Sequence, residues 1–92
     1  MSKLLDPHDD NVGAVLECAV RYALGRKTYM VSVVTGVISP IVPDLSNKTL
    51  LLLEREIVKH ERFFDSTDRK EWIPLRDNLR REIDKRNLER WK

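Results

Sequence analysis

The chain has 92 residues, of which 41% are hydrophobic and 35% are charged, a balance typical of one small globular domain. Its net charge of +2 is far below the single-sign charge that a dedicated DNA-binding protein usually carries. One cysteine excludes an internal disulfide, and no apolar run is long enough for a membrane-spanning helix or a signal-peptide core. The sequence therefore predicts a single cytoplasmic domain over residues 1–92 that has no membrane contact.

The first predicted helix spans residues 10–24 and follows a lead-in segment at 1–8, where a proline interrupts any earlier helix. Asp9 or Asp10 can cap this helix, because a carboxylate accepts hydrogen bonds from the free backbone N–H groups of the first turn. Gly25 stands where a left-handed residue would end the helix.

Apolar residues at helical spacing predict which face of this helix packs on the core. These residues are Val12, Val15, Leu16, Ala19, Tyr22 and Ala23. Cys18 lies among them and is expected to be a small buried residue rather than a nucleophile.

Residues 28–39 are compatible with two structures. Their β-branched residues are typical of a strand. Thr28, however, is a plausible helix cap, and apolar residues recur at intervals of three and four. Because a lone strand would have no partner, we predict a helix that Pro40 ends, followed by a short connector.

The third predicted helix spans residues 46–62, with Ser46 as its cap. Four consecutive leucines at 50–53 make its first half apolar on nearly every side. Such a helix is usually central in a bundle, with neighbours on several faces.

The fourth predicted helix spans residues 68–90. Asp68 and Glu71 have the spacing of a capping box, and Trp72 begins an apolar stripe that continues at intervals of three and four. Pro74 removes a backbone donor, so either the helix is kinked there or a short turn precedes a helix that begins at Pro74. The predicted fold is all-α, a compact bundle of about four helices.

Catalytic and metal-binding chemistry is poorly represented in this sequence. His8, His60 and Cys18 do not have the spacing of a zinc site, and the three glycines form no phosphate-binding loop. We therefore expect neither an enzyme nor a cofactor.

The turn between the first two predicted helices carries Arg26, Lys27 and Tyr29, and its helix–turn–helix order suggests DNA recognition. Residues 29–38, however, are too apolar to contact base edges, and two cations alone bind phosphate only weakly. These three residues are either a packing corner or part of a partner-binding surface.

The C-terminal helix is the second candidate surface. Like charges four residues apart at 76–80, 81–85 and 86–90 destabilise a helix unless an acidic surface relieves them. A solvated charged face is the alternative interpretation. The candidate partner-binding residues in this region are Arg76, Arg80, Arg81, Arg86, Arg90 and the terminal Trp91.

Three segments, RYALGRKTY at 21–29, PDLS at 43–46 and DRKEW at 68–72, resemble small uncharacterised proteins of phages, prophages and other bacterial mobile elements. The resemblance covers about residues 12–80. It implies a compact helical protein and carries no catalytic residue. Small phage proteins are often inhibitors of host machinery or of bacterial defence, including anti-CRISPR proteins.

The resemblance and the charge pattern together suggest a non-enzymatic binding protein that modulates a host or defence protein with an acidic surface. The alternative is a small nucleic-acid-binding regulator that uses the basic C-terminal helix. A homo-oligomeric structural protein is a third hypothesis.

Overall fold

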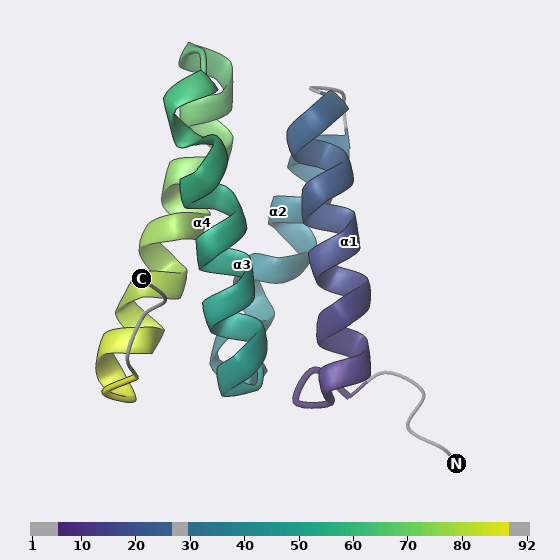
Figure 1. Cartoon of the computed structure of the whole chain (residues 1–92), viewed down its shortest axis with the longest axis vertical. Coiled ribbons are helices and arrows are strands. Elements are labelled where there is room, and N and C mark those ends of the chain that lie inside the picture. Colours follow the sequence, from purple (N-terminus) through teal and green to yellow (C-terminus); the bar gives the residue numbers. More distant parts are fainter. Residues whose placement is uncertain (1–5, 27–29, 89–92) are drawn as a thin grey trace.

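The computed structural model describes residues 6–26 and 30–88 and shows the predicted all-α bundle with four α-helices (Figure 1). The elements in chain order are α1 (Asp10–Arg26), α2 (Met30–Ile38), the 3-10 helix η1 (Ser39–Asp44), α3 (Asn47–His60), the 3-10 helix η2 (Glu61–Phe63) and α4 (Ser66–Lys85).

The bundle consists of two antiparallel helical hairpins, α1–α2 and α3–α4, placed side by side (Figure 1). α1 packs mainly on α3, and α2 packs on α4, so each helix of the first hairpin lies against one helix of the second. The segment η1 contacts both α2 and α4 as the chain crosses from one hairpin to the other.

The core lies between the hairpins and draws on all four helices and η1. Each fully buried Val, Leu or Ile side chain stabilises the fold by about 1.5–3 kcal/mol relative to the same side chain exposed to water. Fully buried apolar residues include Val20, Ala23, Val42, Leu45, Leu50, Leu53, Ile57, Leu79 and Ile83. Trp72 is also buried, as its place on the apolar stripe of the last helix predicted.

The predicted stop of the first helix at Gly25 is wrong, because α1 continues to Arg26. None of the three glycines has a positive φ angle, so Gly25 does not adopt the left-handed conformation that ends helices. The helical boundary therefore lies two residues beyond the predicted 24.

The predicted core face of α1 is correct on one side and wrong on the other. Ala23 is buried as expected, whereas Val15, Tyr22 and Cys18 are exposed. The reason is the side on which the helix packs: α1 turns the face that contains Val20 toward α3, which rotates Val15, Cys18 and Tyr22 outward.

α1 and α3 approach closely at Gly13. A Cβ atom at this position would lie 1.9 Å from Oγ1 of Thr49, so only glycine fits without a shift. The Ser46 hydroxyl lies 2.9 Å from the Thr49 hydroxyl and donates to Oδ1 of Asp10 at 2.7 Å. Ser46 also accepts from the backbone N–H of Thr49, which confirms its prediction as the cap of α3.

The segment predicted as a helix at 28–39 is helical over Met30–Ile38, and residues 28 and 29 lie outside the described residues. Beyond Ile38 the chain does not become an irregular connector. It tightens into η1, because Pro40 fits the first turn of a helix, where no N–H is required.

The third predicted helix, 46–62, ends earlier than expected. α3 ends at His60, and the chain continues as the 3-10 helix η2 to Phe63.

α4 begins before the predicted residue 68. Asp65 is the cap, and Asp68 is the third helical residue whose side chain accepts a hydrogen bond from the Asp65 backbone N–H, so the capping box lies three residues upstream of the predicted one. The helix runs through Pro74 without interruption, which excludes a helix start there. Pro74 is exposed, so water can reach the carbonyl group that its missing N–H leaves unpaired.

α4 also ends before the predicted residue 90. Asn87 has a positive φ of 57°, and the backbone N–H of Leu88 donates to the carbonyl of Ile83 at 3.1 Å. A second bond joins the N–H of Asn87 to the carbonyl of Asp84, which completes a Schellman motif. Leu88 packs on the core cluster, so an apolar contact holds this stop in place.

Candidate functional site

Arg76, a candidate for partner binding, is engaged within the molecule. Its Nη1 lies 2.6 Å from Oε2 of Glu61, and its Nη2 lies 3.0 Å from Oδ1 of Asp77. These hydrogen bonds raise the pKa of Arg76 above its ordinary value, chiefly through Glu61, so the guanidinium is charged at every physiological pH.

Arg80 is likewise paired within the molecule. Its Nε lies 2.9 Å from Oε2 of Glu54, a carboxylate on α3 that is only 5% exposed. A buried carboxylate is costly without a cation, so Arg80 fixes the spacing between α3 and α4.

Arg86 ties the end of α4 to the segment before α3. Its guanidinium donates to the carbonyls of Pro43 and Leu45 at 2.9 and 2.8 Å and to the side chain of Asn47 at 2.8 Å. Its Nε bonds Glu82 at 2.9 Å. The guanidinium groups of Arg76, Arg80 and Arg86 are thus met by acids and carbonyls of the same chain.

Arg81 differs from these three arginines because it is exposed and makes no ion pair with another described residue. Lys27, Tyr29, Arg90 and Trp91 lie outside the described residues, as does the side chain of Arg26. The structure therefore does not bring the predicted site residues together into one described surface.

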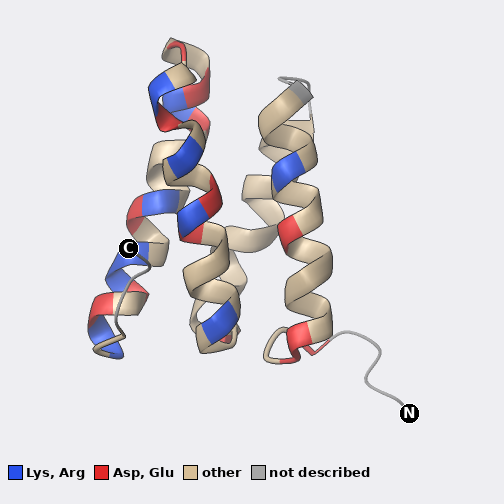
Figure 2. Cartoon of the chain, viewed as in Figure 1, with Lys and Arg blue, Asp and Glu red and all other residues tan. Residues whose placement is uncertain are grey.

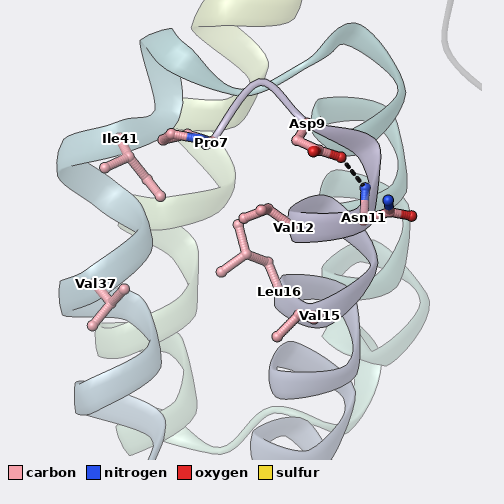
Figure 3. Close-up of a pocket in the computed structure, with 8 residues that line it drawn as sticks. All are labelled: Pro7, Asp9, Asn11, Val12, Val15, Leu16, Val37 and Ile41. Atoms are coloured by element: carbon pink, nitrogen blue, oxygen red, sulfur yellow. Dashed lines mark hydrogen bonds between the residues drawn. The ribbon is translucent and has the colours of Figure 1, made fainter. Parts of the chain in front are cut away.

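A different surface emerges between α1 and α2, where the helices enclose a groove of about 680 Å³ (Figure 3). Val12 and Leu16 of α1 point into it, and Val37 and Ile41 form the opposite wall (Figure 3). Pro7, Asp9, Asn11 and Val15 complete the lining. Val15 and Val37 are 67% and 55% exposed.

A smaller hollow of about 220 Å³ extends this groove along the same two helices. It shares Leu16 and Val37 with the first and adds Ala19, Met30, Val33, Val34 and Ile38. The two hollows therefore form one apolar groove, called the α1–α2 groove below. Of the described residues that line either part, only Asp9 is charged, and it caps α1 through the backbone N–H of Asn11.

The charge distribution separates this groove from the rest of the molecule. Acidic and basic residues are concentrated in α4 and in the second half of α3, whereas α1 and α2 are mostly uncharged (Figure 2). Arg21 of α1 is directed toward Glu17 of the same helix and toward Glu56 of α3, at 3.0 and 3.6 Å, and Asp9 is the one charged residue in the described lining of the groove. The groove is thus an apolar surface exposed to solvent, which is characteristic of protein contact sites.

Across residues 6–26 and 30–88, no group of three or more His, Cys, Asp or Glu side chains is placed to hold a metal ion. In the same part of the chain, no helix combines the length and the apolar character needed to cross a bilayer.

No protein-family model, curated protein or solved structure matches this chain.

The α1–α2 groove was missed in the sequence, where Val12, Val15 and Leu16 were all assigned to the core. A usable signal was the absence of charge from residue 28 to residue 43. α2 has nine residues and is apolar on most sides, and its neighbours α1, η1 and α4 do not cover every side, so part of its apolar surface remains exposed.

Proposed function

We propose that this protein is a non-enzymatic binding protein whose contact surface is the α1–α2 groove. The observation that carries the proposal is the set of exposed valines, Val15, Val33 and Val37, along a groove whose described lining has Asp9 as its one charged residue. Solvent exposure of apolar side chains in such a small domain has a cost that a partner would remove.

The occupant that best fits a groove between two helices is a third helix from the partner. Such a helix would place apolar residues at intervals of three, four and seven against Val12, Leu16 and Val37. A basic residue at one end of that helix would meet Asp9. The resemblance to mobile-element proteins suggests that the partner belongs to the bacterial host or its defence machinery, in the cytoplasm.

The nucleic-acid alternative loses much of its support. Arg76, Arg80 and Arg86 hold other parts of the bundle and would have to break these contacts to reach phosphate. A gel-shift series at two salt concentrations tests it directly, since phosphate binding weakens steeply as salt rises.

The decisive experiment compares two exposed valines. Val37→Asp places a carboxylate in the groove, and Val58→Asp is the matched control, because Val58 is a 40% exposed valine on α3. A host protein identified by capture from bacterial lysate is purified, and its affinity for each variant is measured by calorimetry. We expect a loss of tenfold or more for Val37→Asp and none for Val58→Asp. Equal affinities for the two variants would contradict the proposal.

A further inference from the structure

One exposed face of α3 and η2 carries basic charge alone. Between residues 47 and 63, all of which the structure describes, every exposed charged side chain is a cation. The acids of this stretch are turned to other contacts. Glu54 and Glu56 are each 5% exposed, and Glu61 pairs with Arg76. The cations of this surface, called the basic α3 face below, are Lys48, Arg55, Lys59 and Arg62.

The spacing of these cations places them in one row. Lys48, Arg55 and Arg62 recur every seven residues, which is close to two full helical turns, so their side chains leave the helix in nearly the same direction. Lys59 lies one turn from Arg55 and beside Arg62. At about 1.5 Å per residue the row is about 21 Å long, and Lys and Arg positions recur along α3 (Figure 2). A row of this length and sign fits a chain of phosphates better than a single small anion.

The fold leaves part of this basic charge without a counter-charge. Within the described part of the chain, Lys48 and Arg62 make no ion pair. Lys59 lies 3.5 Å from Glu56 and is still 54% exposed. The arginines of α4 that first suggested nucleic-acid binding are, by contrast, engaged with acids of the bundle. Because neighbouring cations on one helix repel each other, a bound polyanion would relieve the basic α3 face.

An exposed aromatic ring lies at one end of the row. Phe63 is 65% exposed, and the guanidinium carbon of Arg62 lies 5.1 Å from the centre of its ring. Aromatic rings and guanidinium planes are the groups on which unpaired nucleobases stack. In a duplex the bases already stack on one another, and the carboxylates of an acidic polypeptide offer no flat surface to the ring. A cationic row that ends at Phe63 therefore favours a single-stranded nucleic acid.

We propose that the basic α3 face binds single-stranded nucleic acid, with phosphates on its row of cations and one base stacked on Phe63. Lys and Arg contacts to phosphate carry no sequence information, so the binding does not depend on base sequence. With four cations it is weak, with a Kd on the order of 1–100 μM. The inference is independent of the proposed function, because the described lining of the α1–α2 groove contains none of these residues.

Fluorescence anisotropy of a labelled oligothymidine of about 12 nucleotides measures the binding. A single strand on four cations should give a plot of log affinity against log salt with a slope of about −3, so the affinity should fall about 50-fold between about 50 and 200 mM salt. Absence of binding at about 50 mM salt and at protein concentrations up to about 1 mM would overturn the proposal.

Charge reversal locates the binding surface. Lys48→Glu/Arg62→Glu changes both ends of the row and should weaken binding of the oligothymidine more than tenfold. Arg81→Glu/Lys85→Glu is the matched control, because it makes the same change in net charge at two exposed positions of α4. At about 100 mM salt, where charges more than about 10 Å away are screened, the control should lose less than about threefold. Circular dichroism verifies that both variants are folded. Equal losses would show a response to overall charge and would overturn a binding face on α3.

Phe63→Ala separates a single strand from other polyanions. Loss of one stacked base should weaken binding of the oligothymidine about fivefold or more, and binding of a duplex of the same length should stay unchanged. Unchanged binding of the oligothymidine to this variant would overturn the single-strand proposal. Polyglutamate is the probe for an acidic polypeptide. If wild-type protein binds polyglutamate as tightly as an oligothymidine of equal charge, the face recognises acidic protein segments, which would also overturn the proposal.

Discussion

The two helical hairpins use their side chains in opposite ways. Between residues 10 and 38, five of 29 residues are charged, whereas between residues 47 and 85, 19 of 39 are charged. In α3–α4 some of those charges form ion pairs, among them Arg76 with Glu61 and Arg80 with Glu54, and Arg86 just beyond α4 bonds the carbonyl of Pro43, so these contacts hold the bundle together. In α1–α2 the exposed residues include Val15, Val33 and Val37, which line a groove. The charged residues of α3–α4 thus contribute to the packing of the bundle, and the apolar surface of α1–α2 is the better candidate for partner recognition.

The largest expected effect is a loss of stability at a core residue, compared with a much smaller one at a groove residue. Leu79→Ala, at a fully buried position of α4, should lower the free energy of unfolding by about 2–5 kcal/mol, because it leaves a cavity. Val33→Ala in the groove should change it by less than about 1 kcal/mol, because Val33 is 48% exposed. Urea unfolding followed by circular dichroism measures both. Similar losses at the two positions would show that the groove is part of the core.

The next effect tests whether the arginines of α4 are structural. Arg86→Ala should lower the free energy of unfolding by about 2–3 kcal/mol, because it removes the charged donor from the carbonyls of Pro43 and Leu45. Arg86→Lys should recover little, because an ammonium group cannot reach several acceptors in the geometry of a guanidinium. Thermal unfolding of the three proteins checks this order. A variant Arg86→Lys as stable as wild type would indicate that only the charge matters.

Two glycines of the α1–α2 hairpin should respond with opposite signs. Gly13→Ala should destabilise the protein by about 1–3 kcal/mol, because the new Cβ collides with Thr49, which Ser46 holds in place. Gly36→Ala should stabilise it by about 0.5–1 kcal/mol, since Gly36 lies within α2 and no atom blocks a side chain there. The melting temperature of each variant, compared with that of wild type, shows directly whether the substitution stabilises or destabilises the protein. A stabilising Gly13→Ala would mean that α1 and α3 are less closely packed.

The smallest expected effect on stability is at Arg81, which is the exposed one among the predicted partner-binding arginines whose side chains the structure describes. Arg81→Glu should change the free energy of unfolding by no more than about 0.5 kcal/mol, because no described residue pairs with it. The affinity of Arg81→Glu for a captured host protein is then measured beside that of Val37→Asp. Because Arg81→Glu should remain as stable as wild type, a lower affinity would indicate a contact with an acidic partner. An effect on affinity at Arg81 alone would move the binding surface back to α4.

The sequence alone was sufficient for the helical class, because apolar residues at intervals of three and four recur through every segment that became a helix. It also identified Ser46 as a cap and Trp72 as a core residue, since both depend on local chemistry and on the stripe within one helix. The predicted ends of α1 and α4 were wrong for one reason. Gly25 and Asn87 could each adopt the left-handed conformation that ends a helix, and only Asn87 adopts it.

Only the tertiary structure decided which sides of the helices are buried and what the charges do. The apolar stripe of α1 is wide enough to face α3 or solvent, and close packing at Gly13 fixes its rotation, which leaves Val15 and Cys18 exposed. Similarly, the ion pair of Arg80 with Glu54 joins residues 26 positions apart, and helical spacing says nothing about such a distance. Patterns within one helix are local and can be read from sequence, but the partner of each face depends on how the hairpins pack.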